Sequence, residues 1–162
     1  MEQMFVLSKK DLETSLHLNP KSYLAILHLL NIAQFEGNSQ AAENYLMLGV
    51  SVLPSNMILR IRYLIQLTPR WGGSYKSMES FISKCQSQGL SHDKIDLLNA
   101  IKHDDKGFVL EEQGKTVEAR LAYEEALKLS LSGNSRFRQD YLKYSLRICA
   151  KQEHSTKQYC LR

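Results

Sequence analysis

The sequence of 162 residues lacks an apolar run long enough to cross a membrane, and it has few cysteines. No stretch approaches the roughly 18 apolar residues that a membrane-spanning helix needs. The apolar stretch after the acidic start is too short for a secretory signal peptide, so we expect a cytoplasmic protein without a membrane partner. The three cysteines form no CxxC pair and have no histidine at ligand spacing, which predicts reduced thiols and no metal site. Cys85 lies on the apolar face of a predicted helix and is expected in the core.

Motifs of catalysis and of phosphate binding are also missing. The five histidines are scattered, and none belongs to a nucleophile or metal motif. His103, Asp104 and Asp105 are adjacent in sequence, but consecutive helix positions point in different directions, so they do not form one metal site. Lys115 and Thr116 follow a glycine without the rest of the GxxxxGK[ST] phosphate loop. We therefore expect no cofactor and no enzymatic activity.

Positive charge is concentrated towards the C-terminus. The net charge is +4, yet residues 136–162 alone hold seven lysines and arginines against two acids. Such a segment could release counterions from a phosphate backbone, so an RNA-binding helical-repeat protein is the alternative function. The solvated face of a terminal helix has the same composition, and some of these cations favour a helix C-terminus. We favour the solvated face and do not expect nucleic acid as the partner.

Helical periodicity runs through the chain, and strand signals are absent. Pro20 and Pro54 each follow an apolar helical pattern and lie 34 residues apart. Proline disrupts a helix interior but suits a first turn, so each marks a boundary between successive helix pairs. The pattern predicts helices at 22–35, 40–53, 56–66, 74–89, 91–113 and 116–129. The resulting single all-α domain, 1–162, divides into a degenerate leading repeat (1–20), repeats at about 21–54, 55–90 and 91–133, a capping helix (134–151) and a tail (152–162).

The third helix pair carries the clearest signature. Its small and aromatic residues recur at helical intervals, as Gly107, Gly114, Ala119, Tyr123 and Ala126. These positions resemble the tetratricopeptide repeat (TPR), which also has a 34-residue period, with His103 in place of the usual tryptophan. Looser matches are Gly37, Ala42, Gly49 and Pro54. The resemblance implies a TPR-like α-solenoid of about seven helices in antiparallel pairs with a C-terminal capping helix, which binds a protein or peptide and catalyses no reaction.

A long glycine-rich turn, Pro69 to Ser74, interrupts the second pair and holds the single tryptophan. With its neighbours it resembles a bacterial family of uncharacterised domains with helical repeats, which implies a bacterial protein. Trp71 could be an exposed anchor, or it could fold onto the adjacent helices and fill the space that a long turn leaves. We favour the second role for Trp71, and we expect Arg70 to be free to bind.

The TPR resemblance also implies which residues line the groove, because the first helix of each pair forms it. By repeat position they are Asn31, Gln34 and Phe35, then Arg60, Tyr63 and Leu67, then Asp104, Phe108 and Glu111, and finally Arg138. Arginine and tyrosine are frequent interface anchors, although each position could also be an ordinary solvated one. The chain lacks the lysines and asparagines with which carboxylate-clamp members grip a free C-terminus. We expect a non-catalytic interaction module, either an adaptor or a dedicated inhibitor such as an immunity protein.

Overall fold

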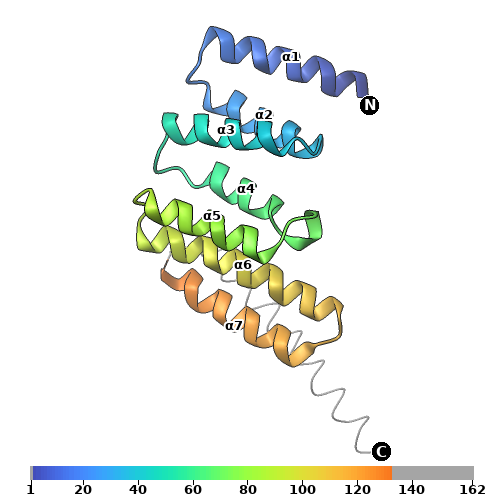
Figure 1. Cartoon of the computed structure of the whole chain (residues 1–162), viewed down its shortest axis with the longest axis vertical. Coiled ribbons are helices and arrows are strands. Elements are labelled where there is room, and N and C mark those ends of the chain that lie inside the picture. The colour runs from blue at the N-terminus through green and yellow to red at the C-terminus, as the bar shows by residue number, and fades with distance from the viewer. Residues whose placement is uncertain (1, 133–162) are drawn as a thin grey trace, which may run out of the picture. The chain divides into compact units, whose positions relative to one another are not determined.

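The computed structural model describes residues 2–132, and this part of the chain is helical apart from its turns. The α-helices are α1 (Glu2–Leu18), α2 (Tyr23–Phe35), α3 (Ser39–Val52), α4 (Ile58–Gln66), α5 (Tyr75–Ser87), α6 (His92–Glu112) and α7 (Thr116–Ser132), and the short 3-10 helix η1 is Pro69–Trp71 (Figure 1). Residues 2–132 contain no strand, so the predicted all-α class is confirmed. The predicted capping helix and tail lie outside the described residues.

The predicted helices and the observed ones differ by only a few residues at their ends. Local hydrogen bonds account for two of the starts. The Asn38 side chain accepts from the backbone N–H of Ala41 at 3.0 Å and caps α3. The Ser74 hydroxyl accepts from the backbone N–H of Ser77 at 3.1 Å and caps α5. Such caps satisfy N–H groups that the first helical turn leaves without partners.

The described helices form two compact units that divide between Leu67 and Thr68. In the first unit, α2 packs against α1, α3 and α4. Gly49 on α3 allows α4 to approach closely, because a Cβ at this position would overlap the Leu59 Cδ1 methyl. Lys9 on α1 forms an ion pair with Glu36, with Nζ 2.7 Å from Oε2.

In the second unit, α6 lies between α5 and α7, and α6 and α7 run side by side over most of their length (Figure 1). Tyr123 on α7 is buried against Gly107 on α6, and Ala119 and Ala126 pack beside it. Cys85 on α5 is 1% exposed, which confirms its predicted place in the core. None of the helices within residues 2–132 combines the length and the hydropathy that a membrane span requires.

Candidate functional site

Two helices of the first unit, α2 and α4, are parallel neighbours. At the start of α2, the Tyr23 hydroxyl donates to Asn56 Oδ1, just before α4, at 2.7 Å. Near the end of α2, Gln34 Nε2 donates to the carbonyl oxygen of Arg62 at 3.3 Å. Because the beginnings of the two helices meet and α2 contacts α4 again further along, the two helices run in the same direction.

One side of α2 is open to solvent and partly apolar. Leu24, His28 and Phe35 are exposed and Asn31 is half-buried, at intervals that place all four on one helical face. The exposed fractions are 67% for Leu24 and 77% for Phe35. The other residues of α2 are mostly apolar, and six of them are buried in the core. This helix therefore has more apolar residues than the core buries.

The neighbouring helix α4 also exposes residues to solvent. Ile58 and Arg62 are exposed one helical turn apart. The backbone carbonyl of Arg62 accepts the hydrogen bond from Gln34, which directly precedes the exposed Phe35. The exposed residues of α2 and α4 therefore lie on two helices that contact each other. We call this surface the α2–α4 face, and it consists of Leu24, His28, Asn31, Phe35, Ile58 and Arg62.

The structure places only part of the predicted groove on this face. Asn31 and Phe35 lie on it, and Gln34 lies at the helix contact. The prediction that Arg60 lines the groove is wrong, because Arg60 is 3% exposed and its Nη1 donates to the Asn56 carbonyl at 2.8 Å. Residues two apart on a helix point to nearly opposite sides, so the exposed arginine of α4 is Arg62. Tyr63 and Leu67 are half-buried.

A charged network in the second unit connects η1 to α5 and α6. Asp105 on α6 is 3% exposed, and its Oδ1 accepts from Arg70 Nε at 2.6 Å. Its Oδ2 accepts from the Tyr75 hydroxyl at 3.2 Å. The guanidinium carbon of Arg70 also lies 4.4 Å from the centroid of the Phe108 ring, within cation–π distance. Arg70, which the sequence predicts to be free to bind, is thus already paired within its own unit, and its role in binding stays a prediction.

Trp71 differs from its predicted position, because 71% of its surface is exposed. The loop backbone fixes this placement through hydrogen bonds from the N–H groups of Trp71 and Gly73 to the Thr68 carbonyl, at 3.0 and 3.1 Å. Gly72 has a φ of 83°, a conformation that favours glycine. With Arg70 turned towards Asp105, the indole that follows is left in solvent. The Arg70 side chain, and not the indole, packs from the loop against α6, where it pairs with Asp105 and lies over the Phe108 ring.

The Tyr75 hydroxyl provides a test of this network. Burial, and then the neighbouring Asp105 carboxylate, raise the pKa of Tyr75 from 10.0 to about 12. The folded chain therefore keeps this proton in a pH range in which the unfolded chain releases it. The resulting stabilisation is complete below about pH 10 and is lost as the pH rises through about 12.

We expect a difference absorbance titration to show this shift. Subtracting the tyrosinate titration of the Tyr75→Phe variant from that of the wild type leaves the ionisation of Tyr75. This ionisation should centre near pH 12. An ionisation near pH 10, the ordinary value of a tyrosine, would show that the hydroxyl is not bound to a buried carboxylate.

The remaining predicted residues are dispersed. Asp104 and Phe108 are half-buried on α6, and Glu111 accepts from the Tyr123 hydroxyl at 2.9 Å. Arg138 lies outside the described residues. Burial, with a contribution from Lys102, lowers the pKa of His103 below its usual 6.5. Within residues 2–132, no group of three or more histidine, cysteine, aspartate or glutamate side chains is placed to hold a metal ion.

Four residues of the α2–α4 face were not among those predicted from the sequence. Leu24 and His28 could have been found by continuing the helical interval backwards from Phe35 and Asn31. Ile58 and Arg62 required the correct register of α4, which begins two residues after the predicted start. The chain matches no protein-family model, no curated protein and no solved structure.

Proposed function

We propose that this chain is a non-catalytic protein-interaction module, related in design to TPR-like helical repeats, and that the α2–α4 face binds a segment of a partner protein. The observation that carries this proposal is the exposure of Leu24, Phe35 and Ile58 on two adjoining parallel helices. Exposed apolar side chains on neighbouring helices favour contact with another molecule, because burying them removes apolar area from water.

The charges of this face indicate the chemistry of the partner. Neither α2 nor α4 contains an aspartate or glutamate, whereas Arg62 is exposed beside the apolar side chains. A partner segment that offers a carboxylate to Arg62 and apolar side chains to Leu24 and Phe35 would complement both features. A rigid scaffold of packed helices keeps the ordering cost on this side of the complex small.

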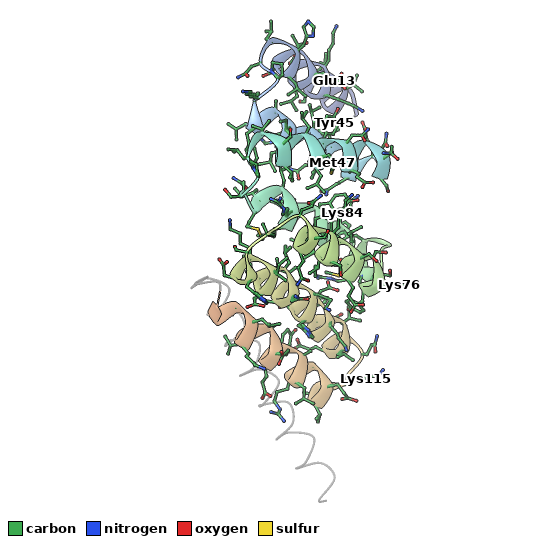
Figure 2. All side chains as sticks on the ribbon, turned by 60° about the vertical axis from the view of Figure 1, so that its left-hand side comes forward. Glu13, Tyr45, Met47, Lys76, Lys84 and Lys115 are labelled. Carbon is green, nitrogen blue, oxygen red and sulfur yellow. The ribbon has the colours of Figure 1, made fainter. Side chains whose placement is uncertain are left out.

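The test compares two variants of the first unit. Leu24→Asp combined with Phe35→Asp places two acids on the α2–α4 face, and Met47→Asp places one on α3, where Met47 is 46% exposed and labelled in Figure 2. We expect partners captured from a lysate of the source cells to be retained by the wild type and by Met47→Asp. The double variant should lose them, and the purified partner should then bind it at least tenfold more weakly, as expected when interface anchors are removed.

Circular dichroism of each variant controls for folding. The proposal fails if the double variant is folded and retains the same partners with unchanged affinity. It also fails if Met47→Asp and the double variant lose binding equally, because the effect would then be one of added negative charge rather than of the α2–α4 face.

A further inference from the structure

The second unit presents the only tryptophan of the chain to solvent on a fixed loop. Proline at position 69, the two hydrogen bonds to the Thr68 carbonyl and the Arg70–Asp105 ion pair restrain the backbone on both sides of Trp71. A large aromatic group on a restrained backbone loses little conformational freedom when a partner covers it. Tryptophan is also among the residue types that most often dominate binding at interfaces.

The charges of the loop segment itself are of one sign. From Thr68 to Ser77 the chain carries Arg70 and Lys76 and no acidic residue, and the next acid, Glu79 on the following turn of α5, is paired with Lys102 at 3.1 Å. The carboxylate that reaches the loop, Asp105, is buried and is bound by Arg70 and Tyr75. Lys76 is exposed on the first turn of α5 (Figure 2). The loop therefore offers cations to a partner without an exposed carboxylate of its own.

Arg70 can contribute although it is already paired. Its ion pair to Asp105 uses Nε, and 42% of its side chain stays exposed. A guanidinium has further N–H groups beyond Nε, so it can donate to a second carboxylate while the first holds it in place. Asp105 and the Phe108 ring thus position the guanidinium beside Trp71.

We propose that Trp71, Arg70 and Lys76 form a docking site, the Trp71 site, for an acidic protein segment that also carries a large apolar side chain. The apolar side chain packs on the indole, and flanking carboxylates bind Arg70 and Lys76. Charge-assisted hydrogen bonds of this kind fix the orientation of the segment, and they weaken with added salt because the site is exposed. The Trp71 site belongs to the second unit and uses no residue of the α2–α4 face.

Because Trp71 is the only tryptophan, the indole fluorescence of the chain comes from this residue alone. The probe is a short synthetic peptide without tryptophan, in which leucine and phenylalanine alternate with aspartate and glutamate. Its control has lysine in place of every acid. The acidic peptide should shift the emission of the full chain to shorter wavelength and reduce quenching by iodide, and the lysine peptide should not. An equal response to both peptides, or no response to the acidic peptide up to about 1 mM, would overturn the proposal.

Variants assign the response to individual residues, with anisotropy of a labelled acidic peptide as the measurement. Trp71→Ala should weaken binding by about tenfold or more, and Lys76→Glu should weaken it by several-fold. Lys115→Glu is the matched control, because Lys115 is also exposed in the second unit and should have no effect (Figure 2). Unchanged binding by a folded Trp71→Ala variant, or equal losses for Lys76→Glu and Lys115→Glu, would refute the site.

One further variant separates this proposal from the proposed function. Leu24→Asp with Phe35→Asp alters the α2–α4 face and should leave the fluorescence response of Trp71 to the acidic peptide unchanged. If this variant abolishes the response, the peptide binds to the α2–α4 face and the Trp71 site is wrong, whereas the proposed function stands.

Discussion

Truncating Tyr123 to alanine should lower the free energy of unfolding of the second unit by about 3–5 kcal/mol, the cost typical of deleting a large aromatic ring from a core. Tyr123 is 1% exposed, and its ring lies against Gly107 at the contact between α6 and α7. Alanine would leave a cavity that Ala119 and Ala126 are too small to fill. Since small domains are stable by only roughly 5–15 kcal/mol, this loss is a large fraction of the total. Urea unfolding followed by circular dichroism measures it.

Two further variants separate packing from hydrogen bonding at this contact. Tyr123→Phe keeps the ring and removes only the hydroxyl that donates to Glu111 at 2.9 Å, so it should cost about 1 kcal/mol. Gly107→Ala adds a Cβ that would lie 2.6 Å from the ring atom Cε1 of Tyr123, and it should destabilise the wild type. In the Tyr123→Ala background the same alanine should be tolerated. Additive effects of the two substitutions would show that Gly107 and Tyr123 are not in contact.

The small and aromatic residues of the third helix pair, which resemble the TPR pattern, meet at the contact between α6 and α7. Gly107, Ala119 and Ala126 are small where two helices approach a buried tyrosine, and the periodicity of such residues can be read without a structure. Prolines and glycines similarly mark where helices end. These features are local, so the helices and the all-α class could be predicted from the sequence to within a few residues.

The surface residues were harder to predict, because small errors of register move a side chain to the other side of a helix. Arg60 and Arg62 have the same chemistry, but only the structure shows that the first is buried and the second exposed. Trp71 was misplaced for a different reason. Its exposure follows from the pairing of Arg70 with Asp105, which lies 35 residues away in sequence, and no local pattern indicates that pairing.

Removing the Asp105 carboxylate is the second substitution for which we expect a large effect. Asp105→Ala should destabilise the second unit by about 2 kcal/mol, because hydrogen bonds to a charged group contribute more than neutral ones. The buried carboxylate accepts from both Arg70 and Tyr75, so both donors lose their partner together. Arg70 is 42% exposed, and water can hydrate it after the change, which keeps the cost below that of stranding a fully buried charge.

Asp104→Ala is the matched control for this experiment, since it makes the same change of charge and of helix propensity one residue earlier on α6. Asp104 is half-buried and stays partly hydrated. Asp104→Ala should therefore lower the free energy of unfolding less than Asp105→Ala does, by at least about 1 kcal/mol. The two variants should also differ at Trp71. Without Asp105, Arg70 no longer anchors η1, so the fluorescence anisotropy of Trp71 should fall, whereas Asp104→Ala should leave it unchanged. Equal losses of stability with unchanged anisotropy would mean that the loop is held by its backbone alone, and that Arg70 is not positioned beside the indole by the buried carboxylate.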